Sequence, residues 1–232
     1  MKTVILSALA ASTLFALIGC NNRAEMQVIQ PTQSAELKPM QQSWRGVLPC
    51  ADCEGIETTL FLEKDGTWVM NQRYQGAKEP SSFATYGKWA RTAEKLVLID
   101  AQGEKTFFRA KGEGMEMLDR EGNPIESQFN YTLAPVNAAL PSTPMAMRGM
   151  YFYMADAAIF TDCATGKKVN VANNAQLERD YAVARGNDSK PVLLTVDGHF
   201  TLEPNPDSGE MVKTLMADKD AKFHAGKDCS DK

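Results

Sequence analysis

The stretch IETTLFLEKDGTWVMNQRY, residues 56–74, predicts the fold of the first half of this chain. Two β-prone runs, residues 56–63 and 67–74, flank Lys64-Asp65-Gly66. Asp-Gly between two such runs is typical of a β-hairpin, because glycine adopts the positive φ angles that tight turns need. The stretch therefore predicts two antiparallel strands, and similar runs lie on both sides of it.

The same pattern continues through residues 43–134, which we expect to form one β domain. About eight short strands are predicted, with tight turns and no convincing helix; the others are 44–48, 82–90, 95–100, 105–110, 114–118 and 128–133. A meander of this number closes most simply as an up-and-down barrel, because closure removes exposed strand edges. Such a barrel is wide enough for side chains or one small ligand.

A second domain is predicted for residues 148–232, after a proline-containing linker at 135–147. Strands are expected at 148–154, 157–161 and 168–171, followed by a helix that begins at Asn173 or Asn174 and ends at Gly186. A hairpin about Asp197-Gly198 and a strand at 212–216 complete the domain. Three strands, one helix and a further hairpin is the order of a small OB-type barrel, so the fold class is all-β.

The N-terminus predicts secretion and lipidation. Residues 1–19 have one positive charge at Lys2 and an apolar core too short to span a membrane. They lead into Leu17-Ile18-Gly19-Cys20, which resembles a bacterial lipobox, so Cys20 is the predicted acylated first residue. Several acyl chains hold a protein firmly on a membrane. Residue 21 is Asn rather than the Asp that typically retains lipoproteins at the inner membrane, which implies the outer membrane and a periplasm-facing body. Residues 20–42 are polar and predict a tether.

Cysteine number fits an oxidising compartment. The chain has five cysteines, and lipidation of Cys20 leaves Cys50, Cys53, Cys163 and Cys229. Three pairings are possible, and loop length and domain position favour Cys50–Cys53 with Cys163–Cys229. In the chain-entropy model the long loop constrains the unfolded chain by about 4 kcal/mol and the short loop by about 2 kcal/mol.

The sequence leaves three alternative roles open for Cys50 and Cys53. They would form a structural disulfide without a redox role, act as a redox- or copper-responsive pair, or catalyse thiol exchange. Cu(I) accepts two thiolates, which makes this pair the candidate metal site. Asp52 and Glu54 oppose thiolate formation, and the pair lies between strands rather than at a helix N-terminus, which disfavours a fast oxidoreductase.

Other features exclude function classes. The chain has 25 basic and 29 acidic residues, and removal of Lys2 with the signal peptide leaves 24 basic residues and a formal charge of −5. The sequence has no basic stripe, which argues against nucleic-acid binding. The methionines, including Met115, Met117, Met145, Met147, Met150 and Met154, are expected to fill cores rather than to bind copper through their thioethers, and His199 and His224 to lie on the surface. No catalytic motif occurs, which predicts a protein that is not an enzyme and requires no cofactor.

The segment Gly46-Val47-Leu48-Pro49-Cys50-Ala51-Asp52-Cys53-Glu54-Gly55-Ile56 resembles the signature of the NlpE (CutF) family of outer-membrane lipoproteins. The resemblance extends over nearly the whole chain, through residues 20–25, 42–45, 117–126, 150–156 and 160–167. Residues 211–232 depart most from the family pattern.

The resemblance implies a fold and a function. The fold would be a lipocalin-like N-terminal barrel followed by a C-terminal OB-like domain. The function would be copper homeostasis and surface-contact sensing in cell adhesion, with activation of the Cpx envelope-stress pathway through the inner-membrane sensor kinase CpxA. A lipoprotein anchored in this way also depends on the lipoprotein sorting machinery. The alternative is a periplasm-facing barrel whose main task is to bind copper or a small apolar ligand.

Overall fold

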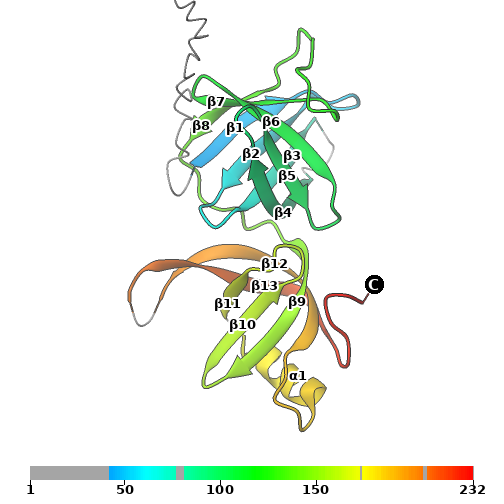
Figure 1. Ribbon diagram of the computed structural model, residues 1–232, viewed down its shortest axis with the longest axis vertical. Helices are drawn as coiled ribbons and strands as arrows, with labels where there is room; N and C mark the ends of the chain where they lie inside the picture. The colour runs from blue at the N-terminus through cyan, green and yellow to red at the C-terminus, as the bar shows by residue number, and fades with distance from the viewer. Residues whose placement is uncertain (1–41, 77–80, 173, 206–207, 232) are drawn as a thin grey trace, which may run out of the picture. The chain divides into compact units, whose positions relative to one another are not determined.

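The computed structural model describes residues 42–76, 81–172, 174–205 and 208–231 (Figure 1). These residues belong to one compact unit and form two closed β-barrels. The predicted all-β class is therefore confirmed. Cys20, the signal peptide and the polar residues up to 41 lie outside the described residues. Among the described helical segments, none has the length and apolar character needed to cross a bilayer.

The first barrel contains eight antiparallel strands in sequence order. They are β1 (Gln42–Leu48), β2 (Gly55–Leu62), β3 (Thr67–Gln75), β4 (Ser82–Arg91), β5 (Leu96–Asp100), β6 (Lys105–Lys111), β7 (Gly114–Met117) and β8 (Thr132–Val136). β8 pairs with β1 through Ser43↔Val136 and closes the barrel. The up-and-down meander predicted from the sequence is the observed topology, because each strand pairs with its neighbour along the chain.

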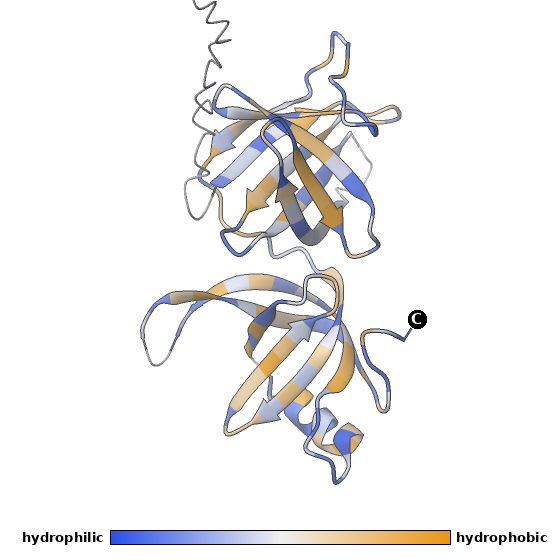
Figure 2. Ribbon diagram, viewed as in Figure 1, coloured by the Kyte–Doolittle hydropathy of each residue, from blue (hydrophilic) through white to orange (hydrophobic). Residues whose placement is uncertain are grey.

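Large apolar side chains fill the first barrel. Leu60, Leu98, Phe108 and Leu133 are fully buried, and Trp44 packs with them. The strands are banded with hydrophobic and hydrophilic residues, as expected where alternate side chains face the core and the solvent (Figure 2). The barrel interior is therefore a packed core.

The expected strand at residues 128–133 is wrong in its bounds. β8 begins at Thr132 instead, because side chains in the preceding segment accept the backbone N–H groups that a strand would use. Ser127 Oγ accepts from Phe129 N at 3.1 Å, and Asn130 Oδ1 accepts from Thr132 N at 3.0 Å. β7 and β8 are therefore joined by a long loop.

The second barrel contains five strands and one helix among the described residues. They are β9 (Met145–Met154), β10 (Ala157–Asp162), β11 (Lys168–Ala172), α1 (Ala175–Arg185), β12 (Val192–Pro204) and β13 (Met211–His224). The barrel closes in the order β10-β11-β13-β12-β9, and β11 pairs with β13 in parallel. The predicted order of three strands, a helix and a hairpin is confirmed.

The predicted turn at Asp197-Gly198 is wrong. β12 runs through both residues, and its register against β13 shifts on either side of Asp197. Gly198 lacks the positive φ that such a turn requires, and a Cβ atom there would lie 2.5 Å from Met216 O. This glycine therefore permits close approach of β13, which carries the extra residues at both register shifts; β12 ends at Pro204 and β13 begins at Met211.

The helix has its predicted N-cap and end residues, but the N-cap side chain does not act as a cap. Asn174 is the N-cap of α1, but its side chain makes no capping hydrogen bond and lies 3.5 Å from the Tyr151 hydroxyl. Gly186 ends the helix with φ 60°. Leu177 and Tyr181 are buried against the barrel, so α1 covers one end of the second core.

Candidate functional site

The Cys50–Cys53 disulfide forms a small loop between β1 and β2. Its Cα atoms are 5.3 Å apart. Asp52 and Glu54 are exposed beside it. Gly55 closes the loop with φ 153°, and a Cβ there would lie 2.4 Å from Val47. The loop therefore depends on a residue without a side chain at this position.

The Cys163–Cys229 disulfide joins the turn after β10 to the C-terminal tail. The Cα atoms are 5.3 Å apart and the cysteines are 66 positions apart in sequence. Both expected cysteine pairings are thus present. The long bond closes most of the second barrel into one covalent loop, whereas the short bond closes three positions at one end of the first barrel.

Asp162, the residue before Cys163, organises the turn that holds this cysteine. Its side chain is buried, and Oδ2 accepts from Thr165 N at 2.7 Å and Thr165 Oγ1 at 2.6 Å. Its backbone carbonyl accepts from Gly166 N at 2.8 Å. One buried carboxylate therefore fixes the geometry of residues 162–166, in which Cys163 lies.

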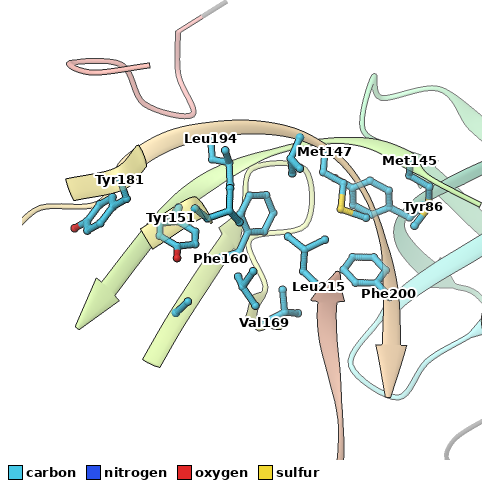
Figure 3. Close-up of a cluster of buried hydrophobic side chains, with 14 of the residues drawn as sticks. Tyr86, Met145, Met147, Tyr151, Phe160, Val169, Tyr181, Leu194, Phe200 and Leu215 are labelled. Carbon is cyan, nitrogen blue, oxygen red and sulfur yellow. The ribbon is translucent and has the colours of Figure 1, made fainter. Parts of the chain in front are cut away.

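The other oxygen of Asp162 bonds to the first barrel. Tyr86 of β4, also buried, donates its hydroxyl to Asp162 Oδ1 at 2.6 Å. The Tyr86 ring meets Phe200 edge to face at 5.5 Å and lies beside Met145 (Figure 3). Burial, followed by the charge of Asp162, raises the pKa of Tyr86, so the phenol stays protonated and remains a donor. The turn bearing Cys163 is thus hydrogen-bonded directly to the first barrel.

A second polar contact between the barrels centres on Lys213 of β13. Its Nζ lies 2.7 Å from Glu63 Oε2, 3.1 Å from Asp65 Oδ2 and 2.7 Å from Thr67 Oγ1. The side chains of Lys213 and Glu63 are 11% and 14% exposed, so this ion pair is largely desolvated. Such a pair resists removal of either partner, because the remaining charge would be left buried without compensation.

The pKa values of the two carboxyl groups beside Lys213 shift in opposite directions. Burial raises the pKa of Glu63, and attraction to Lys213 offsets it only in part. For Asp65 burial acts in the same sense, but hydrogen bonds from Thr67 and the charge of Lys213 together lower its pKa. Glu63 Oε1 is buried and has no hydrogen-bond partner among the described residues, which explains why desolvation prevails at this group.

A cavity of about 510 Å³ lies beside this junction. Its apolar walls include Phe61, Leu140, Phe200 and Leu202, and Glu63 is among its polar lining residues. This volume is within the range of small-ligand pockets. The space therefore lies between the barrels, whereas the sequence suggested a ligand within the first barrel.

The methionines and histidines lie where packing and hydrogen bonds account for them. Met115, Met145 and Met147 are buried in the two cores, and Met117 packs against the first core. His199 Nδ1 is 2.8 Å from Asp218 Oδ2, and His224 Nε2 is 2.9 Å from Thr195 Oγ1. Within the described ranges, no three His, Cys, Asp or Glu side chains cluster as a metal site would require. The expected core role is confirmed for these four methionines, but it is wrong for Met154, which is 63% exposed at the end of β9, and Met150 is only half-buried.

Sequence reasoning missed Tyr86, Asp162 and Lys213. Tyr86 and Asp162 are 76 positions apart, and their residue types are common in strands and turns. The one local feature that could have pointed to Asp162 was its position directly before Cys163. An acidic residue that is buried beside a structural cysteine needs specific hydrogen-bond donors.

Comparison with known families accounts for both barrels. Residues 44–128 match the NlpE N-terminal domain, and residues 141–230 match the NlpE C-terminal OB domain. The chain is 68% identical to Lipoprotein NlpE of Escherichia coli (strain K12) over 231 residues, which cover 99% of this chain and 98% of that protein. The chain belongs to the NlpE family.

Two solved structures are similar to this member of the NlpE family. The crystal structure of the Cpx pathway activator NlpE from Escherichia coli has 70% sequence identity, covers 83% of this chain and all of the other, and has a TM-score of 0.42. A putative lipoprotein from Shewanella oneidensis has 31% identity over 41% of this chain and 88% of its own, with a TM-score of 0.35.

Proposed function

We propose that this chain is a lipid-anchored, non-enzymatic sensor that activates the Cpx envelope-stress response. The relative with 70% identity is named as a Cpx pathway activator, and the relative that covers nearly the whole chain is named as a lipoprotein. In this proposal Cys20 carries the acyl chains, the body faces the periplasm from the outer membrane, and the receiving partner is the inner-membrane kinase CpxA. Delivery to the membrane uses the lipoprotein sorting machinery.

The Cys163–Cys229 disulfide is the observation that carries the proposal. It lies next to Asp162, whose side chain holds both the cysteine-bearing turn and Tyr86 of the first barrel. When oxidative folding succeeds, the bond stabilises the second barrel and keeps the turn in place. The first barrel then retains its contacts through Tyr86 and Lys213, and the sensor is silent.

When copper or poor oxidation leaves the bond open, the second barrel loses about 4 kcal/mol of chain-entropy stabilisation. A domain of this size has a total stability of only about 4–12 kcal/mol, so much of its margin is removed. Unfolding or loosening of the turn then removes the acceptor of Tyr86. The first barrel is released, and the surface that meets the kinase becomes available.

The test is signalling by Cys163→Ala and Cys229→Ala variants, measured with a Cpx-dependent reporter at matched protein abundance. Both variants are expected to signal above wild type without added stress. Cys50→Ala with Cys53→Ala is the matched control, because it removes a disulfide that is remote from Asp162 in the sequence. If the Cys163 and Cys229 variants signal no more than wild type, the mechanism is wrong.

A Tyr86→Phe variant tests release of the first barrel separately from loss of the Cys163–Cys229 disulfide. It keeps both disulfides and the aromatic ring but removes the hydrogen bond to Asp162. If release of the first barrel is the trigger, this variant signals above wild type while the Cys163–Cys229 bond stays oxidised. Signalling at the wild-type level would limit the role of this hydrogen bond to packing.

The cavity beside Glu63 favours a second candidate, binding of a small apolar ligand. Cys50 and Cys53, once reduced, offer the two thiolates that Cu(I) accepts, so copper is the alternative ligand and the link to copper homeostasis. Both are tested on purified protein, by mass spectrometry of extracted ligands and by metal analysis of wild type against Cys50→Ser with Cys53→Ser. Protein that carries neither an extractable apolar molecule nor cysteine-dependent copper would remove this candidate.

A further inference from the structure

The segment of residues 228–231 is attached to the second barrel at the surface. β13 ends at His224, and all residues from Ala225 to Asp231 are exposed. The segment folds on itself through Asp228, whose Oδ1 accepts from Ser230 N at 2.7 Å and Ser230 Oγ at 2.6 Å. A short exposed turn of this kind buries little apolar surface, so its position on the barrel depends on specific contacts.

Arg148 of β9 supplies these contacts from its side chain. Nη2 donates to Asp228 O at 2.9 Å and to Asp231 O, and Nη1 donates to Cys229 O at 3.3 Å. One guanidinium therefore binds three backbone carbonyls of a four-residue segment that contains Cys229. A planar group with several fixed donors suits this arrangement, whereas a lysine ammonium is a single compact charge.

The backbone of Arg148 contacts the other cysteine. Its carbonyl oxygen accepts from Cys163 N at 2.9 Å. One residue thus holds the chain on both sides of the disulfide: its main chain fixes the turn of Cys163, and its side chain fixes the carbonyls around Cys229. The spacing of the two Cα atoms, 5.3 Å, is within the range that a disulfide requires.

We propose that Arg148 is a positioning residue for the Cys163–Cys229 bond. In the reduced protein it holds the exposed tail on the barrel and raises the effective concentration of Cys229 thiol at Cys163. The function of this device rests on the proposed sensor role, because it would set how reducing the envelope must become before the bond opens. The positioning itself is a property of the thiol equilibrium and does not depend on signalling.

The reduced thiols of Cys163 and Cys229 are oxidised by exchange with a low-molecular-weight disulfide such as glutathione disulfide. The thiolate of one cysteine attacks a glutathione sulfur and expels one glutathione thiolate, which forms a mixed disulfide. The second cysteine thiolate then attacks the protein sulfur of that mixed disulfide and expels the second glutathione. The two protein thiols lose two electrons and two protons, and glutathione disulfide becomes two glutathione thiols. Arg148 favours the second step, because it keeps the two cysteines adjacent.

The experiment measures the equilibrium constant of this exchange on the full mature chain. Purified protein is equilibrated in glutathione buffers, the thiols are quenched by alkylation, and the fraction of Cys163–Cys229 is quantified from its peptides by mass spectrometry. For Arg148→Gln we expect the constant for disulfide formation to fall about fivefold, equivalent to about 1 kcal/mol. Arg148→Lys, which keeps the charge but not the planar fork, is expected to fall between Arg148→Gln and wild type.

Arg179→Gln is the matched control, because Arg179 lies on α1 and bonds to Gln176, so its removal changes the charge without touching the tail. Its constant should equal that of wild type. The constant for Cys50–Cys53, read from the same samples, should be the same in all variants. An Arg148→Gln constant equal to that of wild type, or a fall of the same size in Arg179→Gln, would overturn the proposal.

A general loss of stability is distinguished by adding Arg148→Gln to a Cys163→Ser, Cys229→Ser background. Positioning predicts little change in the urea midpoint there, because the bond it serves is absent. A midpoint that falls as far as in the disulfide-containing protein would assign Arg148 a structural role instead. A normal sensor response with a shifted glutathione constant would contradict the sensor mechanism while leaving the positioning role intact.

Discussion

Removal of the long disulfide should destabilise the second barrel about twice as much as removal of the short disulfide destabilises the first. The perturbation is Cys163→Ser with Cys229→Ser, compared with Cys50→Ser with Cys53→Ser. The closed loops differ in length, with separations of 66 and 3 positions. In the chain-entropy model these correspond to about 4 and about 2 kcal/mol of unfolding free energy.

The size of the second barrel determines how far this loss of unfolding free energy lowers its unfolding temperature. From Met145 to Cys229 the barrel has about 85 residues. For domains of this size, 1 kcal/mol shifts the unfolding midpoint by about 4–8 °C. Loss of about 4 kcal/mol should therefore lower the midpoint of the second barrel by about 15–30 °C, whereas the short pair should shift the first barrel by about half as much or less.

The assay is differential scanning calorimetry of the full mature chain in wild-type, long-pair and short-pair forms. The two transitions are assigned by the cysteine pair whose loss moves each one. The expected result is a downward shift of one transition in the long-pair variant that is at least about twice the shift of the other transition in the short-pair variant. If the long-pair variant shifts no further than the short-pair variant, loop closure does not govern the stability of the second barrel, and the reasoning is refuted.

Three further perturbations test the junction and the first barrel. Tyr86→Phe should cost about 1.5–3 kcal/mol of unfolding free energy, because it removes a hydrogen bond to a buried carboxylate; a double-mutant cycle with Asp162→Asn that gives no coupling energy would contradict this. Because burial raises the pKa of Glu63, the folded state binds its proton more tightly than the unfolded state, and this stabilisation is lost as pH rises from about 4.5 through the raised pKa. Urea midpoints of wild type should therefore fall relative to Glu63→Gln over that interval, and parallel pH profiles would argue against it. Gly87→Ala should destabilise the first barrel by about 1–3 kcal/mol, because the added Cβ would lie 1.9 Å from Ile99 O, and an unchanged urea midpoint would contradict this close approach.

The strand bounds predicted from the sequence are correct where the residues of the turn alone determine where the chain reverses. They are wrong where side-chain hydrogen bonds or a bulge in the partner strand also determine it. Lys64-Asp65-Gly66 turns as predicted, and Gly66 has the positive φ of 86° that such a turn uses. Asp197-Gly198 has the same residue types and does not turn, because β12 continues through it to Pro204 and stays paired with β13, which bulges opposite Asp197. The dipeptide alone does not distinguish the two outcomes; the length of the paired strand does.

By itself the sequence determined the all-β class, the order of strands around the helix and the favoured cysteine pairing, because these follow from short-range turn signals and from cysteine spacing. Only the tertiary structure decided which polar residues meet at the junction. Tyr86 and Asp162 are 76 positions apart, and Lys213 and Glu63 are 150 apart. Nothing in the local pattern links such positions, because the register of two closed barrels and the burial that makes their hydrogen bonds strong exist only after the chain has folded.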